Sequence, residues 1–200
     1  MHIHNLFPIP VAFFDLQRPL TDSEREFIVN QKQRPNMGNT SSENNYLLES
    51  QELSELKQFF QNSVDDFFYK VHSPKTNVSL RITQAWSNYT KPGGFHHKHS
   101  HPNSLISGVF YVQTDPEKDR IYFYKDGYQQ IKLKTESYNE FNSESWWFEA
   151  VPNKLILFPS SLTHMVEALP NDAKTRISLS FNTFPIGNIG DALELTELIV

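Results

Sequence analysis

Four of the eight histidines in the 200-residue chain are crowded into one short segment, at positions 96, 97, 99 and 101. In an extended strand, side chains two residues apart lie on the same face, so we expect His97, His99 and His101 to point the same way. Two imidazoles at that spacing can hold one transition-metal ion if a third ligand comes from a distant part of the chain. The alternative is a polar, solvated loop, because the preceding Pro92-Gly93-Gly94 is typical of a turn.

A third ligand is available at His164. This histidine follows an apolar run, Leu155–Phe158, that is typical of a buried strand, and a short polar turn. Facing into a barrel, it would complete a site with three ligands on one side of a metal ion. An isolated histidine in this position is more often packed in the core or exposed, so the prediction depends on the cluster at residues 96–101.

The chain also offers a candidate carboxylate-binding face. From residue 176 onward, Arg176, Ser178 and Ser180 alternate with apolar residues. If this face points into a barrel, the guanidinium of Arg176 would bind a carboxylate through two parallel hydrogen bonds, and the hydroxyl of Ser178 would add another. The alternative is that the polar face lies in water, as is usual for an antiparallel strand, and the periodicity does not distinguish the two faces.

The residues suited to chemistry follow one another along the chain in the order Tyr89, Gly93-Gly94, His99, His101, His164 and Arg176-Ile177-Ser178. Over about residues 78–184, this order resembles that of 2-oxoglutarate- and iron(II)-dependent dioxygenases, especially prolyl-hydroxylase-like members and their small bacterial and phage relatives. Gly94 lies five residues before His99, and this spacing selects His99 and His101 as the first ligand pair. The resemblance implies that His99, His101 and His164 bind Fe(II), with 2-oxoglutarate and O2 as cosubstrates.

The same resemblance assigns residues to the cosubstrate. Arg176 and Ser178 match the pair that binds its far carboxylate, and Tyr89 and Tyr111 match tyrosines that contact it. The implied reaction is the hydroxylation of an unidentified substrate with release of succinate and CO2. One position departs from the family pattern, because His101 stands where the family has a carboxylate. Three neutral imidazoles leave Fe(II) with two net positive charges instead of one, so the identity of the metal is open. The alternative is that His101 lies outside the ligand set and that an acidic residue from elsewhere in the chain completes it.

Two other functions fit parts of the pattern. A cupin, which has the same jelly roll, could be a metal-binding protein, an isomerase or a dioxygenase without cosubstrate, and the spacing from Gly93 to His99 and His101 matches its first motif. The glutamate that continues this motif is missing, since Leu105 and Ile106 stand there. The third interpretation is a non-catalytic jelly-roll protein with histidines on its surface.

The elements that would position these residues are helices first and strands afterwards. Thr21 and Glu24 have the spacing of a capping box for a helix from Asp22 to about Lys32. Apolar residues recur at helical spacing through residues 53–71 and predict a second helix that covers a sheet. Residues 34–45 are expected to form a loop. Strands are expected at Val78–Trp86, Leu105–Val112, Ile121–Lys125, Tyr128–Leu133, Leu155–Phe158, Met165–Leu169 and Arg176–Phe184.

This pattern predicts a mainly β fold, a double-stranded β-helix (jelly roll) flanked by N-terminal helices. We expect a single domain over residues 1–200, with the core at about 78–184 and the helical flank at about 20–72. The chain has no cysteine, which excludes disulfides and thiolate chemistry. Its net charge of -5 argues against a nucleic-acid partner.

Neither a membrane segment nor a signal peptide is visible, so a cytoplasmic location is expected. The expected partner is a small-molecule or peptide substrate. A homodimer is compatible with the sequence, which leaves the oligomeric state open.

Overall fold

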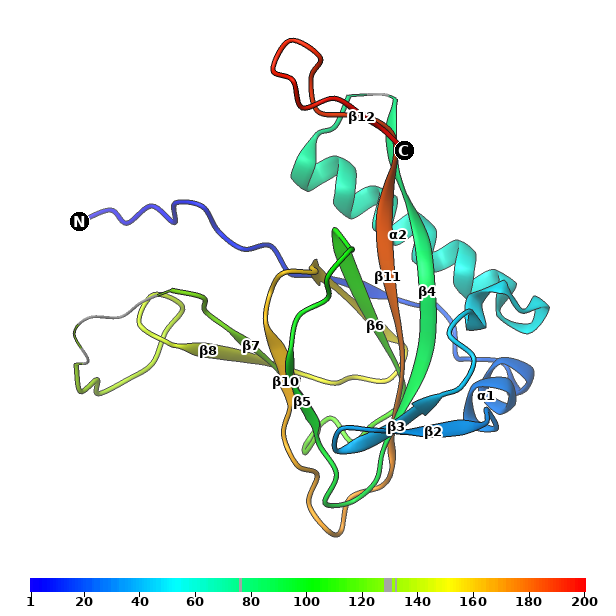
Figure 1. The fold of residues 1–200 in the computed structure, drawn as a ribbon. Helices are drawn as coiled ribbons and strands as arrows, with labels where there is room; N and C mark the ends of the chain where they lie inside the picture. The colour runs from blue at the N-terminus through cyan, green and yellow to red at the C-terminus, as the bar shows by residue number, and fades with distance from the viewer. Residues whose placement is uncertain (76, 128–130, 132) are drawn as a thin grey trace.

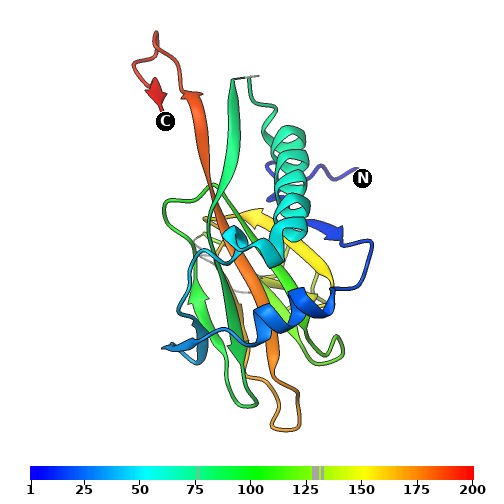
Figure 2. The ribbon, with the colours of Figure 1, turned by 90° about the vertical axis from the view of Figure 1, so that its right-hand side faces the viewer.

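The computed structural model describes residues 1–75, 77–127, 131 and 133–200. Strands form two facing sheets, and helices lie on the outer side of the larger one (Figures 1 and 2). The helical elements are α1 (Asp22–Val29), the short 3-10 turns η1 (Leu47–Glu49) and η2 (Gln51–Leu53), and α2 (Ser54–His72). Among the residues that the structure describes, no helix combines the length and apolar character needed to cross a membrane.

The two sheets are antiparallel and confirm the predicted double-stranded β-helix. The large sheet runs in the order β1 (Ala12–Asp15), β9 (Lys154–Pro159), β6 (Ile106–Gln113), β11 (Arg176–Ile189), β4 (Val78–Thr90), β3 (Asn39–Ser42) and β2 (Gln33–Asn36), and β12 (Leu198–Ile199) pairs with the end of β11. The small sheet runs in the order β5 (His96–His99), β10 (His164–Val166), β7 (Arg120–Tyr124) and β8 (Ser145–Glu149).

The helices pack on one face of the large sheet because each presents an apolar side. Helix α1 begins with the predicted capping box, in which the Glu24 backbone N–H donates to Thr21 Oγ1 (3.2 Å) and the Thr21 N–H donates to the Glu24 carboxylate (2.8 Å). On α2, Phe60 is fully buried against Phe110 and Phe181 of the sheet, with ring centroids 5.3 and 5.1 Å apart. This helical layer holds the main core and fixes the outer face of β4, β6 and β11.

The opposite face of the large sheet looks toward the small sheet. A second, smaller core lies between them, where Val109 and Phe158 of the large sheet pack with Ile121 and Phe123 of the small one. Alternate residues of each strand therefore serve two different layers. The helix side is filled with apolar side chains, whereas the space between the sheets also contains polar ones.

The described strands contain three register shifts, and those in β4 and β5 bear on which side chains enter that space. In β4, the three steps from Ile82 to Ala85 oppose only two steps of β11, from Thr183 to Phe181. The extra residue reverses the alternation, so Leu80 and Ala85 both face the helices although their numbers differ in parity. In β5, the three steps from residue 96 to 99 oppose two steps of β10, from 166 to 164.

Some expected elements differ from the structure. The predicted loop at residues 34–45 contains the hairpin of β2 and β3, whose polar residues lack the apolar alternation that marks a half-buried strand. Strand β7 pairs with β8. In the expected strand Tyr128–Leu133, residues 128–130 and 132 lie outside the described residues. The aromatic residues at 146–148 lie within β8, where Trp146 and Trp147 are exposed.

Candidate metal centre and cosubstrate cavity

Three histidines from separate parts of the chain meet between the sheets. His99 ends β5, His164 begins β10 directly opposite it in register, and His101 follows β5, where its backbone N–H donates to the Ser160 carbonyl (2.9 Å). One ring nitrogen from each of the three histidines lies within 4.8 Å of the other two. This distance suits three donors around a single ion, which the resemblance predicted for these residues.

Backbone carbonyls orient two of these rings. His99 Nδ1 lies 2.7 Å from the His97 carbonyl oxygen, and His164 Nδ1 lies 3.0 Å from the Leu162 carbonyl oxygen. Each Nδ1 therefore carries the proton that it donates, and each Nε2 keeps a free lone pair. Metal-binding histidines in proteins are held in this way, since the hydrogen bond fixes both the tautomer and the ring plane.

Burial keeps the three rings neutral. It lowers the pKa of His164 to about 3 and of His101 to about 4, and a smaller part of each shift comes from the nearby His99. Burial likewise lowers the pKa of His99. At neutral pH, the three imidazoles are therefore unprotonated and available as ligands for a divalent transition metal.

Arg176 and Ser178 line the same cavity as the three histidines. Both side chains are buried, and Arg176 Nη1 donates to the Arg120 carbonyl oxygen (3.1 Å). Among the residues that the structure describes, no carboxylate lies within ion-pair distance of this guanidinium. Part of its hydrogen-bonding capacity is therefore available to an anionic ligand, and the polar face of β11 points inward.

The two tyrosines are placed differently. Tyr111 lies opposite Ser178 in the sheet, and its ring lies below the guanidinium of Arg176, 5.2 Å from it. Its hydroxyl is buried without a hydrogen-bond partner among the described residues, and burial raises its pKa to about 12. Tyr89, in contrast, faces the helices, where its hydroxyl donates to the Ile28 carbonyl and pairs with the Ser87 hydroxyl (2.7 Å). The structure therefore does not bring Tyr89 to the cavity.

Sequence reasoning missed several residues that line the cavity, among them Trp86, Asn88 and His96. The ring of Trp86 lies 5.9 Å from that of His101, and Asn88 donates from Nδ2 to Ser180 Oγ (3.1 Å). Asn88 pairs with Ser178 in register, so the inward direction of Ser178 would have identified it. No sequence signal marks the bulge in β5 that turns His96 inward.

The free space among these side chains is small, about 30 Å³. A volume of this size admits a metal ion or about one water molecule. A dicarboxylate such as 2-oxoglutarate is larger, so its binding requires neighbouring side chains to move apart.

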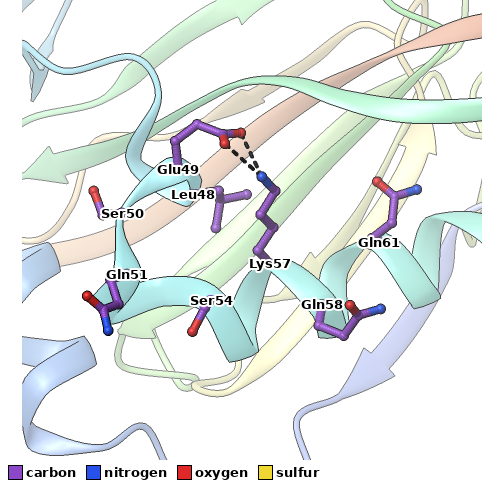
Figure 3. A pocket seen from close by; sticks show the side chains of 8 residues that line it. All are labelled: Leu48, Glu49, Ser50, Gln51, Ser54, Lys57, Gln58 and Gln61. Atoms are coloured by element: carbon purple, nitrogen blue, oxygen red, sulfur yellow. Dashed lines mark hydrogen bonds and ion pairs between the residues drawn. The ribbon is translucent and has the colours of Figure 1, made fainter.

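A larger surface hollow of about 290 Å³ lies where η1, η2 and α2 meet (Figure 3). Its two charged lining residues, Glu49 and Lys57, neutralise each other, since Lys57 Nζ lies 2.8 Å from both carboxylate oxygens. The other lining residues are Leu48 and small or amide side chains, so the hollow has no group suited to catalysis. The chemistry of the described residues is concentrated between the sheets.

Comparison with known proteins agrees with the predicted family. The model of the family described as "Putative 2OG-Fe(II) oxygenase" matches residues 84–182, which include the three histidines and Arg176. The prediction of Fe(II), with 2-oxoglutarate and O2 as cosubstrates, is confirmed by this family. No curated protein matches the chain.

Solved structures with the same fold share little sequence with this chain. A Pseudomonas putida prolyl-4-hydroxylase has a TM-score of 0.58 at 13% identity, with 87% of this chain and 92% of that chain covered. The 2-oxoglutarate-dependent epimerase SnoN of nogalamycin biosynthesis has a TM-score of 0.60 at 9% identity, covering 90% and 79%. HygX from Streptomyces hygroscopicus, with nickel, 2-oxoglutarate and hygromycin B bound, has a TM-score of 0.56 at 10% identity, covering 88% and 83%. At these identities, the structures support the fold alone.

Proposed function

Because this chain belongs to the 2-oxoglutarate- and iron(II)-dependent oxygenases, we propose that it hydroxylates a small-molecule or peptide substrate while converting 2-oxoglutarate to succinate and CO2. One observation carries the proposal. Three neutral imidazoles from separate segments meet in a cavity that also contains the buried guanidinium of Arg176. A metal site and an anion site in the same cavity are what binding of a 2-oxo dicarboxylate requires.

In this proposal, His99, His101 and His164 hold Fe(II), whose redox chemistry with O2 supplies the oxidising power. Imidazole nitrogens suit Fe(II) among other divalent transition metals, so the donor set fits this ion. The carbonyls bound to His99 and His164 keep the rings aimed at it. The protein thus contributes a fixed and neutral donor set.

Arg176 and Ser178 are proposed to bind the far carboxylate of 2-oxoglutarate. The guanidinium offers a planar pair of donors, and burial strengthens its attraction for an anion because the surroundings are less polarisable than water. Tyr111 supports the position of Arg176 from below the guanidinium plane. Tyr89 has no part in the proposed cosubstrate site, since its hydroxyl is bound on the helix side.

The neutral His101 would alter the charge of the centre. With no carboxylate ligand, Fe(II) keeps two net positive charges, which favours binding of the doubly negative cosubstrate. Replacing His101 by aspartate restores the family's usual charge. We expect this variant to retain Fe(II) and to bind 2-oxoglutarate more weakly than the unmodified protein.

The proposal is tested by succinate formation without a known substrate. The purified protein, freed of metal, is supplied with Fe(II), 2-oxoglutarate and O2, and succinate is measured by mass spectrometry. We expect slow succinate release that His164→Ala abolishes and Arg176→Lys reduces, because lysine retains the charge but lacks the planar pair of donors. His4→Ala, in the exposed N-terminal arm, is the matched control. Equal succinate formation with and without Fe(II), or in His164→Ala, would contradict the proposal.

A further inference from the structure

The bulge in β5 brings two more histidines close to His99. In a regular strand, residues three apart point to opposite faces, but the extra residue turns His96 and His99 to the same side. His96 lines the cavity, and its ring stacks on that of His99 with centroids 4.6 Å apart. The ring of His97 lies 4.8 Å from that of His99 and 5.3 Å from that of His96.

These rings form a second group of possible ligands. One ring nitrogen each from His96, His97 and His99 lies within 4.8 Å of the other two, as in the group of His99, His101 and His164. His97 Nδ1 is buried and has no hydrogen-bond partner among the described residues. A buried polar atom without a partner costs free energy, and a bound ion would satisfy it. Ring stacking accounts for the position of His96 but leaves this nitrogen of His97 unexplained.

We propose that His96, His97 and His99 form an alternative binding site for a divalent transition-metal ion. We call this site the outer seat, and the site formed by His99, His101 and His164 the inner seat. The outer seat lies on β5, an edge strand of the small sheet, and its three histidines are only half-buried, whereas His164 of the inner seat is buried. An ion from solvent therefore reaches it more directly than it reaches the inner seat. Metal binding at this outer seat does not require the proposed oxygenase reaction.

The two seats exclude each other because they share His99. Its Nδ1 donates to the His97 carbonyl oxygen, which leaves Nε2 as the one lone pair available to an ion. One lone pair binds one ion, so the protein binds a single ion per chain at either seat.

The test is an anaerobic titration with Co(II), followed by visible absorption and by metal analysis after desalting. In His101→Ala/His164→Ala, only the outer seat is intact, and we expect one Co(II) per chain. Adding His97→Ala to this variant should weaken binding at least as much as the loss of an outer-sphere partner does, about 10–100-fold. Adding His4→Ala is the matched control and should change nothing, because His4 lies in the exposed N-terminal arm.

A double variant that is folded and binds no Co(II), or a His97→Ala addition without effect, would overturn the proposal. Thermal unfolding establishes that each variant is folded. The unmodified protein provides a second measurement that needs no variant. A stoichiometry of one Co(II) per chain is expected, and two tightly bound ions per chain would contradict seats that share His99.

Discussion

Replacement of Arg176 by methionine should weaken ligand binding without lowering the stability of the fold. Arg176 is only 3% exposed, and among the described residues its guanidinium makes one hydrogen bond, to the Arg120 carbonyl. The nearby Asp119 carboxylate interacts with it electrostatically, and burial raises the pKa of that carboxyl. A buried cation with few partners is costly to the unliganded protein, so a ligand explains its position better than folding does.

The magnitudes follow from these contacts. Losing a buried, hydrogen-bonded partner of a charged ligand typically costs about 2–5 kcal/mol, so Arg176→Met should weaken binding of the cosubstrate analogue N-oxalylglycine by about 30-fold to several thousand-fold. Arg176→Lys keeps the charge and should lose about 1.5–3 kcal/mol of hydrogen bonding, or about 10- to 150-fold. Exchanging a buried charge for an apolar side chain is often neutral or stabilising by about 1–4 kcal/mol.

Calorimetry with N-oxalylglycine, in the presence of anaerobic Fe(II), measures the affinity of each variant. Thermal unfolding without ligand measures stability, and each kcal/mol shifts the midpoint by about 2–4 °C in a chain of this size. We expect Arg176→Met to lose affinity while its unfolding midpoint is unchanged or higher. Unchanged affinity, or a midpoint lowered by more than about 5 °C, would refute the reasoning and assign Arg176 a structural role.

Three other predictions concern the framework of the site. Tyr89→Phe should destabilise the fold by about 1–3 kcal/mol in urea unfolding, because it leaves the buried Ile28 carbonyl and Ser87 hydroxyl without this partner. The affinity for N-oxalylglycine should not change, and a loss of affinity would show that Tyr89 belongs to the cosubstrate site. Gly108→Ala should lower the free energy of unfolding by about 1–3 kcal/mol in the same assay, since an added Cβ would lie 2.3 Å from the ring of Phe181. An unchanged free energy would show that the Phe181 ring can move aside without cost. Burial raises the pKa of Glu24, but its hydrogen bonds to Arg18 and to the helix cap outweigh burial and hold the pKa below its usual value. The stability that Glu24 contributes should therefore be complete at neutral pH and disappear as the pH falls through its lowered pKa. The unfolding curves of Glu24→Gln and of the unmodified protein should then differ at neutral pH and converge in acid; curves that differ equally at both pH values would contradict this.

The sequence predicted the fold well because periodicity reports which residues are buried. Helix α2 follows the apolar spacing from Leu53 to Val71, and β6 and β9 follow their apolar runs. The meeting of His99, His101 and His164 was also predicted, since the order of motifs along the chain resembles a known family. These signals depend on local pattern and order, which a single sequence contains.

The errors come from features that local pattern does not report. Val78, Leu80 and Trp86 share a parity in the sequence, yet the bulge in β4 places Leu80 against the helices and Trp86 in the cavity. The same bulge puts Tyr89 on the helix side, because one extra residue moves every later side chain of a strand to the other face. The inward direction of Arg176 is set by tertiary packing, since both faces of its strand fit an antiparallel sheet.

The central claim is that His99, His101 and His164 bind one metal ion beside a carboxylate held by Arg176. The most direct measurement is a crystal structure of the protein with Mn(II) and N-oxalylglycine, in which anomalous scattering locates the metal. We predict one strong peak within bonding distance of Nε2 of His99, Nε2 of His164 and a ring nitrogen of His101, and an analogue carboxylate paired with the guanidinium. A peak elsewhere, or an analogue that does not contact Arg176, would contradict the assignment of this cavity as the oxygenase centre.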